Sequence, residues 1–463
     1  MISLDEDKQA IVMGLGRFGG GLGASRYLLG RGMRVIVTDT ASETELSEPI
    51  AALREEFPSD RITFVLDGHE KVSIDDCDML VVNPAVPQPW NNTFLHEATE
   101  AGLLICTEIE LLLDRLSEIG QNQLIAVTGS AGKSTTCSMI AHLARRSGRA
   151  CLLGGNIGGS LLNHSDADLL DADAIVLELS SFMLHWIGQG LVNFEPEVGV
   201  LTSLDENHID WHGSMEHYIA SKSMIRDSKQ FIPPIHDHGI SQSVNALESD
   251  SGVEPWWRSS KDDWVHETRD MILKEVRTPL PGGHQKENAA TACVALSALL
   301  STGARNRSDF ARSLAPLVID FEGLEHRLRP LGMTSGILVI DDSKSTTPGA
   351  TKRAIEAFDD ASKIHLIAGG FDKGADLSPI ASMGTKLGGL YGVGQTGHLI
   401  SMGGTGIDCH TIEKAVQEAG KRMENGDVLL LSPGCASWDQ FSNYQERGKA
   451  FRRSVETSLG SFE

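Results

Sequence analysis

The sequence predicts an α/β protein built from three domains. Its 463 residues correspond to about three domains of ordinary size, because a domain averages about 150 residues. Strand-like apolar runs alternate with helix-like runs along almost the whole chain, and this alternation predicts mostly parallel sheets. Many of the 48 glycines directly follow apolar runs, as glycines do where parallel strands end in tight turns.

The first domain is expected to span residues 1–116. Its expected elements are a strand at 10–14, a helix from about residue 20, strands at 34–39 and 79–83, a Pro-rich turn at 83–89 and a helix at 108–116. The polar stretch 117–123 indicates a linker to the second domain.

The second domain is expected to span residues 117–323 and the third residues 324–463. The second has expected strands at 124–128, 174–178 and 197–202, a helix at 136–146 and an irregular excursion with short strands at 232–277. The third has four expected strands, each followed by turn residues and a helix, at 336–340, 363–368, 389–393 and 427–431.

Composition and charge exclude several classes of function. Hydrophobic residues make up 41% and charged residues 22%, which is ordinary for a soluble globular protein. The net charge of −23 repels nucleic-acid backbones and anionic membranes, so we expect no nucleic-acid partner. We see no apolar run of transmembrane length, no export signal, and no CxxC pair among the seven cysteines. These features favour a cytoplasmic protein without membrane insertion.

The first candidate site is the stretch GLGRFG at residues 14–19, directly after the first expected strand. Asp39 lies about 20 residues further on, at the end of the next strand, as in the fingerprint of dinucleotide-binding folds. The glycines allow close approach of the backbone to a diphosphate, which the helix N-terminus attracts. A nicotinamide cofactor, another nucleotide diphosphate, or a turn that merely needs small residues all remain open.

A second glycine-rich loop, GSAGKST at residues 129–135, follows the strand at 124–128. Backbone amides of such a loop wrap phosphates, Lys133 meets the outer phosphates, and Ser134 can bind Mg²⁺. The spacing departs from the usual GxxxxGK[ST] pattern, because Val127 stands where the first glycine is expected. We expect ATP binding, and a purely structural loop is the alternative.

Candidate magnesium ligands follow other strands of the same domain. Glu178 ends the apolar run at 174–178, and His208 and Asp210 follow the strand at 197–202. A carboxylate and polar residues at the carboxyl ends of parallel strands suit a hard cation and its ligands. The alternatives are a helix cap for Glu178 and a structural role for His208. The histidines of the stretch HDH at 236–238 are interpreted as an exposed loop rather than a metal site.

The third domain carries polar groups at the ends of several strands. The stretches DDSKST at 341–346, GGFDK at 369–373 and SPGCAS at 432–437 each follow an apolar run, and His326 and Arg327 precede them. Such clusters form a site more often than a core, although each stretch by itself could be a turn or a helix cap.

As a set, these motifs resemble the Mur ligases over nearly the whole chain. The stretches that carry the resemblance are the phosphate loop at 129–135, GGNIG at 154–158, LELSSF at 177–182, NHIDWH at 207–212, DSKST at 342–346 and LSPGCASWDQF at 431–441. The resemblance implies a Rossmann-like N-terminal domain, a central ATPase domain of the P-loop type and a Rossmann-like C-terminal domain. It also implies that the first domain binds a uridine diphosphate substrate rather than NAD.

The resemblance further implies an ATP-dependent amide ligase that adds D-glutamate to UDP-N-acetylmuramoyl-L-alanine through an acyl phosphate. It implies ATP and Mg²⁺, with two metal sites, small-molecule substrates as the only partners, and a monomer. Lys133, His208, Lys222 and Glu178 would be catalytic. Ser134, Glu178, His208 and Lys222 would organise Mg²⁺, with Lys222 carbamylated.

The remaining implied residues fall into three binding sets. The ATP set is Gly129, Gly132, Lys133, Ser134, Thr135, Gln285, Asn288, Arg327, Asp342 and Lys344. The UDP-substrate set is Gly16, Arg17, Phe18, Asp39, Thr40, Asn83, Asn156 and Ser180. The D-glutamate set is Thr346, Lys373, Ser437 and Tyr444. Ala131, Gln285 and Thr347 depart from the family pattern.

Four other functions compete with this interpretation, and the first of them is that of another Mur ligase. A folylpolyglutamate synthase-like ligase would not need the N-terminal nucleotide-type domain, a nucleotide-sensing P-loop protein would not turn over an amino acid, and an NAD-dependent dehydrogenase would not use ATP.

Overall fold

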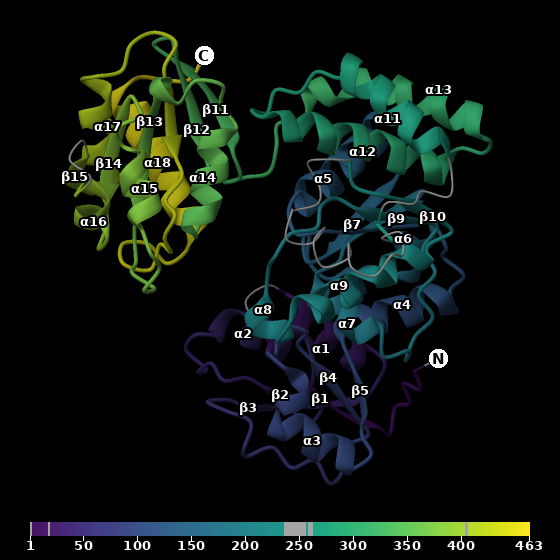
Figure 1. Cartoon of the computed structure of the whole chain (residues 1–463). Helices are drawn as coiled ribbons and strands as arrows, with labels where there is room; N and C mark the ends of the chain where they lie inside the picture. Colours follow the sequence, from purple (N-terminus) through teal and green to yellow (C-terminus); the bar gives the residue numbers. More distant parts are fainter. Residues whose placement is uncertain (1, 17–18, 236–255, 258–262, 403–405) are drawn as a thin grey trace. The chain divides into compact units, whose positions relative to one another are not determined.

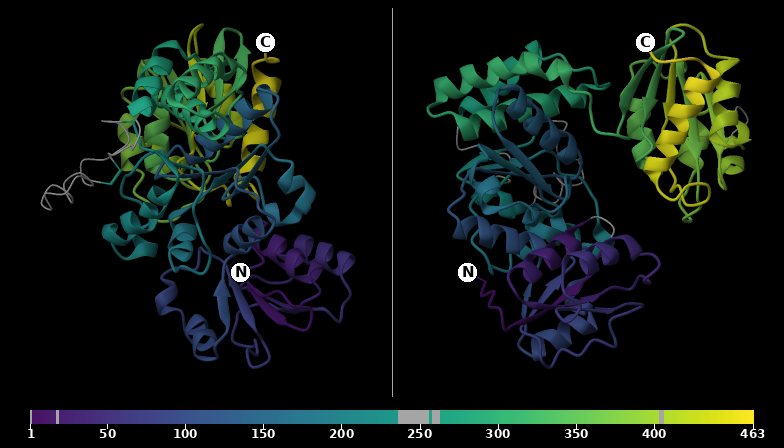
Figure 2. Two further views of the ribbon diagram at one scale, coloured as in Figure 1. Left: turned by 90° about the vertical axis from the view of Figure 1, so that its right-hand side faces the viewer. Right: turned by 180° about the vertical axis from the view of Figure 1, so that it is seen from behind.

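The computed structural model describes residues 2–16, 19–235, 256–257, 263–402 and 406–463. Its contacts divide the chain into two compact units, the first formed by residues 1–275 and 288–315 and the second by residues 276–287 and 316–463. The first unit holds two sheets and the second unit holds a third (Figure 1, with further views in Figure 2). These three α/β sheets confirm the predicted fold class, whereas the domain limits at residues 116 and 323 stay predictions.

The first sheet has five parallel strands in the order β3-β2-β1-β4-β5. The strands are β1 (Gln9–Met13), β2 (Arg34–Thr38), β3 (Ile62–Val65), β4 (Met79–Val82) and β5 (Leu104–Cys106). The helices are α1 (Gly20–Gly30), α2 (Ser47–Glu56), α3 (Thr93–Glu100) and α4 (Glu108–Glu118), with a short 3₁₀ turn η1 (Pro89–Asn91).

Alternate residues of β1 pack on opposite faces of this sheet. Ala10 and Val12 belong to a core that includes α1, α2 and α4, whereas Ile11 and Met13 belong to a core that includes α3. Helices therefore cover both faces, which explains why β4 is apolar at every position.

Helix α4 shows how the local sequence sets the start of an element. The Thr107 side chain accepts a hydrogen bond from the Glu110 amide, and the Glu110 carboxylate accepts one from the Thr107 amide, which forms a capping box. Ile109, Leu112 and Leu116 then recur at helical spacing and are buried.

The second sheet has five parallel strands in the order β10-β9-β6-β8-β7. The strands are β6 (Leu124–Thr128), β7 (Cys151–Gly155), β8 (Ala174–Glu178), β9 (Val198–Leu201) and β10 (Gln230–Ile232). The helices are α5 (Lys133–Arg146), α6 (Asp166–Leu170), α7 (Ser181–Ile187), α8 (Ile209–His212), α9 (Met215–Ser223), α11 (Asp263–Glu275), α12 (Gly283–Leu300) and α13 (Ala304–Leu314). Because the strands are parallel, the carboxyl ends of β6, β8 and β9 lie at one edge of the sheet.

The third sheet has the strand order β11-β12-β16-β13-β14-β15, and only the edge strand β11 is antiparallel to its neighbour. The strands are β11 (Arg329–Thr334), β12 (Ile337–Asp341), β13 (Ile364–Gly369), β14 (Gly389–Val393), β15 (Ile407–His410) and β16 (Val428–Leu431). The helices are α14 (Pro348–Glu356), α15 (Ser378–Met383), α16 (Gly397–Ser401), α17 (Ile412–Gly420) and α18 (Tyr444–Ser458). One core joins the sheet to α17 and α18, and a second core joins it to α14, α15 and α16.

Two sequence-based expectations need correction. Helix α5 begins at Lys133 rather than at residue 136, because the glycine loop leads directly into the first turn. Within the excursion 232–277, residues 263–275 form the helix α11 rather than an irregular segment, since Trp264, Val265, Thr268 and Ile272 recur at helical spacing and are buried. The histidines at 236 and 238 lie outside the described residues. Among the described residues, no helix combines the length and the apolar character needed to cross a membrane.

Candidate active site

Two glycines shape the phosphate loop between β6 and α5. Gly129 has φ +152° and Gly132 has φ +82°, both in the range that favours glycine. A Cβ on Gly129 would overlap the Thr202 hydroxyl, and one on Gly132 would lie 2.8 Å from the Asn288 Oδ1. Gly132 is also the residue before α5, and no side chain caps the helix there. The first-turn amides of α5 are thus offered to a ligand, and the helix dipole favours an anion.

The loop is fastened to the segment after β9. The Ser130 amide donates to the Ser203 carbonyl (2.9 Å) and the Ala131 amide donates to the Ser203 Oγ (2.8 Å). The Ser130 hydroxyl lies 2.8 Å from the Asp205 carbonyl and 2.7 Å from the Tyr218 hydroxyl. Ser130 and Ala131 therefore hold the loop in place, and the Ala131 departure leaves this backbone geometry intact.

Lys133 and Lys222 converge on one carbonyl oxygen of the loop. The Lys133 ammonium donates to the Gly129 carbonyl (2.9 Å), and the Lys222 ammonium donates to the same carbonyl (3.0 Å) and to the Thr128 hydroxyl (3.1 Å). Lys222 is 1% exposed. Burial, reinforced by the Lys133 charge, holds the pKa of Lys222 well below its ordinary value.

Glu178 ends β8 as a buried carboxylate. Its Oε1 accepts a hydrogen bond from the Asn156 side chain (3.0 Å), while its buried Oε2 has no hydrogen-bond partner among the described residues. Gly155, at φ +85°, allows the close approach of β7, because a Cβ there would overlap the Glu178 carbonyl oxygen. A buried carboxylate oxygen without a partner is unfavourable by itself and is suited to a hard cation.

His208 precedes α8 in the left-handed conformation, with φ +56°. Its ring packs edge-on against Phe182, with ring centroids 4.8 Å apart. Burial lowers the pKa of His208, and the charges of Lys133 and Lys222 lower it further, so the imidazole is neutral at pH 7. The fold therefore brings His208, Lys133, Lys222 and, at the end of β8, Glu178 to one edge of the second sheet.

The rest of the predicted ATP and magnesium residues divide between the two units. Ser134 is buried in the first turn of α5, next to Thr135, and Asn288 accepts from the Thr136 hydroxyl (3.4 Å). Gln285 belongs to the second unit, where its amide nitrogen lies 3.1 Å from His284. In the described part of the chain, no group of three or more His, Cys, Asp and Glu side chains is placed to hold a metal ion.

Beside the glycine stretch of the first sheet, the Asp39 carboxylate already has hydrogen-bond partners within the chain. Gly14, Gly16 and Gly19 have φ between +64° and +91°. Asp39 accepts hydrogen bonds from the Gly16 amide (3.1 Å) and the Ala41 amide (2.9 Å), so it fixes the loop.

The other residues of the UDP-substrate set lie in different settings. Thr40 and Asn83 are exposed, and Asn83 Oδ1 accepts from the Ala85 amide (2.9 Å). The Ser180 hydroxyl caps α7 by accepting from the Met183 amide (3.2 Å). Arg17 and Phe18 lie outside the described residues.

In the second unit, Asp342 is a buried residue directly after β12. Its carboxylate accepts from the Ser432 hydroxyl (2.7 Å) and the Leu328 amide (3.1 Å), and burial raises the pKa of Asp342 to about 7. Lys344 is exposed, with its ammonium 5.3 Å from the centre of the Tyr444 ring. Arg327 is exposed as well.

The predicted D-glutamate residues lie on neighbouring loops of the same unit. Ser437 is buried, Thr346 and Tyr444 are half-buried, and Lys373 is exposed. The Lys373 ammonium lies 4.2 Å from the centre of the Trp438 ring.

Sequence reasoning missed Arg447, which joins two of these motifs. The guanidinium is 2% exposed and donates to Ser343 Oγ (3.1 Å) and O (2.7 Å) and to the carbonyls of Cys435 and Ala436 (3.0 Å each). Burial lowers the pKa of Arg447 to about 10, so it stays charged at pH 7. Its spacing from Phe451 and Val455, on the buried face of α18, was the available signal.

Comparisons with known proteins indicate the family of the chain. Residues 127–296 match the family model described as the Mur ligase middle domain. A curated relative from Streptococcus agalactiae, UDP-N-acetylmuramoylalanine–D-glutamate ligase, is 33% identical over an alignment 479 positions long, which covers 99% of this chain and 99% of the relative.

Two solved structures are similar in fold. MurC from Thermotoga maritima, a UDP-N-acetylmuramate-alanine ligase, has a TM-score of 0.56 at 17% identity. The match covers 98% of this chain and 100% of the MurC chain. MurF ligase from Thermotoga maritima in complex with ADP has a TM-score of 0.52 at 16% identity and covers 99% of both chains.

Fold and site together define a three-sheet α/β protein with a phosphate loop in its central sheet. The full-length identity to the Streptococcus agalactiae relative shows the family: the chain belongs to the Mur ligases.

Proposed function

We propose that the chain is an ATP-dependent amide ligase that joins D-glutamate to UDP-N-acetylmuramoyl-L-alanine in the synthesis of peptidoglycan precursors. The observation that carries the proposal is the 33% identity to a ligase of that name over 99% of both chains. The phosphate loop, the buried Glu178 and the two converging lysines support it locally.

In the proposed reaction, the alanine carboxylate attacks the γ-phosphate of ATP and gives an acyl phosphate and ADP. The neutral amine of D-glutamate then attacks the acyl carbon, and inorganic phosphate leaves as the amide forms. The first-turn amides of α5 bind phosphate oxygens. The Lys133 ammonium gives up its hydrogen bond to the Gly129 carbonyl and contacts the outer phosphates of ATP instead. His208 stays neutral because its pKa is lowered, so it can act as a ligand at pH 7.

The residues at the edge of the second sheet fit magnesium. The unpartnered Glu178 Oε2 is a hard oxygen donor, and Glu178 pairs in the sheet with Val127, at the end of the strand that leads into the phosphate loop. We propose that Ser134, Glu178, His208 and a modified Lys222 hold Mg²⁺ at two sites. The bound ion supplies charge that stabilises the transferring phosphoryl group.

Lys222 is the proposed site of carbamylation. Because burial lowers its pKa, Lys222 is the neutral amine more often than an ordinary lysine is, and the lone pair of that amine can form a bond to the carbon of CO₂. The nitrogen loses one proton to solvent, and the product is a carbamate anion. This change replaces a buried cation by an oxygen ligand beside Glu178, which removes the repulsion between Lys222 and Lys133.

The remaining assignments are proposals of the same kind. The ATP set, the UDP-substrate set and the D-glutamate set are assigned as the resemblance implies, with Asp39 and Ser180 also holding local backbone groups. We further propose that the protein works in the cytoplasm, which is consistent with its seven free cysteines, and that it is a monomer. Size-exclusion chromatography with light scattering tests the monomer.

The test of the function is phosphate release from ATP and Mg²⁺ in the presence of UDP-N-acetylmuramoyl-L-alanine. D-glutamate, L-glutamate, L-lysine and meso-diaminopimelate are added in turn, and the product is weighed by mass spectrometry. Release with D-glutamate alone, together with the amide product, supports the ligase and its specificity. No release with any amino acid would favour a nucleotide sensor.

The test of the modified lysine is Lys222→Ala, with Lys229→Ala as the control. Lys229 has a 57% exposed side chain and pairs with Glu197, so its loss leaves the site intact. We expect Lys222→Ala to lose activity and to recover part of it with added short carboxylates such as formate. Full activity of untreated Lys222→Ala would contradict the carbamate.

A further inference from the structure

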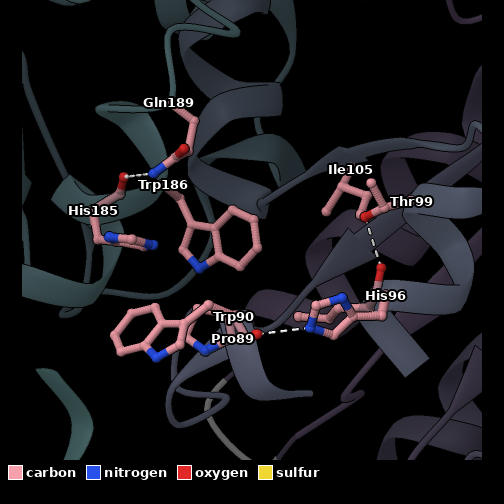
Figure 3. A pocket seen from close by; sticks show the side chains of 9 residues that line it. Pro89, Trp90, His96, Thr99, Ile105, His185, Trp186 and Gln189 are labelled. Carbon is pink, nitrogen blue, oxygen red and sulfur yellow. Dashed lines mark hydrogen bonds between the residues drawn. The ribbon is translucent and has the colours of Figure 1, made fainter. Parts of the chain in front are cut away.

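Two cavities in the first unit have the same volume, about 330 Å³, but different walls. The first lies between α3 and α7, and its described lining residues include no Asp, Glu, Lys or Arg (Figure 3). The second lies where α1 and α4 meet a short 3₁₀ turn, η2 (Leu161–Asn163). Its described lining residues include three arginines and no Asp or Glu. The arginine-lined cavity therefore offers cationic donors that the other one lacks.

Arg115 fixes the inner wall of this cavity. Its side chain is 8% exposed and pairs with Asp166 (2.7 Å). The guanidinium also donates to the Leu162 carbonyl (3.1 Å) and the His164 carbonyl (2.8 Å). These bonds join α4, beside the first sheet, to the turn η2 of the second, so the wall is held in place by the chain itself.

Arg26 and Arg31 form the outer wall and are held by carboxylates. Arg26 donates to the Glu56 carboxylate through Nε and Nη2, and Arg31 Nη2 donates to the Glu118 carboxylate (3.0 Å). Arg31 Nη2 also donates to the Tyr27 hydroxyl (3.1 Å). Each guanidinium is therefore oriented before any ligand arrives, which lowers the entropic cost of binding one.

Both outer arginines keep donors that a ligand can reach. Arg26 Nη1, and Arg31 Nε and Nη1, make no hydrogen bond among the described residues. None of these nitrogens belongs to the buried side-chain atoms that lack a partner, and the two side chains are 30% and 37% exposed. Solvent therefore reaches these donors, and so can a molecule in the cavity.

Two neutral groups add further donors to the wall. The Tyr27 ring lies between arginines, with the guanidinium carbons of Arg31 and Arg115 5.4 and 5.2 Å from its centre. Burial raises the pKa of Tyr27, so its hydroxyl keeps its proton at pH 7 and can donate it in a hydrogen bond. The Asn163 side chain is exposed at the same wall and carries an amide donor.

The chemistry of the wall selects an anionic ligand. The carboxylates that pair with the three arginines are more exposed than the arginines themselves and do not line the cavity. A molecule inside the cavity therefore meets the guanidinium side of each ion pair. A planar guanidinium matches the paired oxygens of a carboxylate or phosphate, and two outer arginines can each take one such group.

We propose that this arginine-lined cavity binds a small molecule that carries at least two carboxylate or phosphate groups, and that Arg26 and Arg31 each bind one of these groups. None of its lining residues belongs to the sets assigned to ATP, the UDP substrate or D-glutamate. The proposal does not depend on the ligase activity.

The test follows the four tyrosines of the full chain by ¹⁹F NMR after labelling with 3-fluorotyrosine. Tyr27 lines the cavity, Tyr218 contacts the phosphate loop, Tyr444 belongs to the proposed D-glutamate set, and Tyr391 is buried in the third sheet. Each resonance therefore reports on a different place, and Tyr27→Phe assigns the first.

The probes are citrate and inorganic pyrophosphate, titrated separately at pH 7 and constant ionic strength without substrates or Mg²⁺. A saturable shift of the Tyr27 resonance is expected, whether or not pyrophosphate also shifts Tyr218 at the phosphate loop. A response to citrate alone identifies carboxylates as the anionic groups, and a response to pyrophosphate alone identifies phosphates. Acetate, which carries a single carboxylate, is expected to bind at least about 10-fold more weakly than citrate, because it can engage only one arginine.

Four variants test the residues, and circular dichroism checks that each one folds. Arg26→Gln and Arg31→Gln should each weaken binding of the responding probe by about 10-fold or more, the loss of one charge-assisted hydrogen bond. Glu118→Gln should tighten it, because it removes the anion that competes for Arg31. The matched controls are Arg34→Gln and Glu100→Gln, which make the same charge changes at exposed positions outside the cavity and should change binding by less than about 2-fold.

Several results would overturn the proposal. They are no saturable shift of the Tyr27 resonance with either probe, acetate binding as tight as citrate, and a loss for Arg26→Gln or Arg31→Gln no larger than for Arg34→Gln. Equal effects of Glu118→Gln and Glu100→Gln would overturn it as well, because the anions would then respond only to the overall charge of the chain.

Discussion

Arg447 gives the most direct test of how the second unit holds its proposed site together. Its guanidinium spans two loops, because it donates to both the side chain and the backbone of Ser343 and to the carbonyls of Cys435 and Ala436. In the first loop Ser343 directly precedes Lys344, and in the second loop Ala436 directly precedes Ser437. The substitution Arg447→Lys keeps the charge but replaces the planar guanidinium, whose N–H donors point in several fixed directions, by a compact ammonium group.

The expected loss in free energy of unfolding follows from the four hydrogen bonds of the guanidinium. A lysine ammonium at this depth can serve one of the two loops, so about two bonds are lost. Each bond between a charged group and a buried acceptor contributes about 1.5–3 kcal/mol, so the second unit should lose about 3–6 kcal/mol. The two loops should also separate, which raises the KM for D-glutamate and ATP more than it lowers kcat.

The assay must report on the second unit alone, because a chain of several domains need not unfold in two states. Trp438 is the only tryptophan of residues 276–287 and 316–463, so its resonance in 5-fluorotryptophan-labelled protein reports this unit during urea unfolding. Arg452→Lys on the same helix is the control, since Arg452 is 57% exposed and pairs only with Glu456 among the ion pairs described, and its effect should stay below about 0.5 kcal/mol. A loss for Arg447→Lys no larger than that of the control would refute the reasoning.

Two further predictions concern the first unit. Burial raises the pKa of Glu108 to about 7, and its carboxylate accepts from the Ser160 hydroxyl. Because the pKa of Glu108 is raised in the folded state, wild type loses stability as the pH rises from about 4.5 through 7. Glu108→Gln keeps a hydrogen-bond acceptor but does not titrate. Its free energy of unfolding relative to wild type, measured by urea titration, should therefore rise by about 2–3 kcal/mol between pH 5 and pH 8. A pH-independent difference would contradict this. Gly155→Ala should lose more stability and activity than Gly190→Ala, because both residues have left-handed φ but only at Gly155 would the new Cβ overlap the Glu178 carbonyl; equal thermal melts and equal kcat would contradict it.

The sequence predicts the parallel sheets well because their buried strands are apolar at nearly every position. Strands β6, β8 and β14 begin and end where the apolar runs do, and the other strands predicted with stated bounds differ by at most one residue at each end. The motifs at Gly129, Glu178 and His208 could be assigned to one edge because parallel strands place their carboxyl ends together. For this assignment it was enough that each motif directly follows a predicted strand.

The sequence could not predict contacts that depend on how distant segments meet. The role of Asp39 as a partner of the Gly16 amide, and the missing partner of Glu178 Oε2, are set by side-chain geometry. Helix α11 was missed because tryptophans and prolines near it suggested an irregular segment. Arg447 was missed because a lone arginine in a helix usually lies in solvent.

Three departures from local rules lie together in the second sheet. A buried lysine that shares a carbonyl with a second lysine, a buried carboxylate oxygen without a partner, and a histidine in the left-handed conformation all lie at one sheet edge. Each is unfavourable alone, and sequences rarely keep such features where nothing compensates them. Phosphates would give the Lys133 ammonium anionic partners, a cation would pair with the Glu178 oxygen, and a carbamate on Lys222 would remove the buried positive charge. The same three ligands that the proposed reaction requires are therefore the ones that would relieve the site, so substrate binding and stability of the second sheet should rise together.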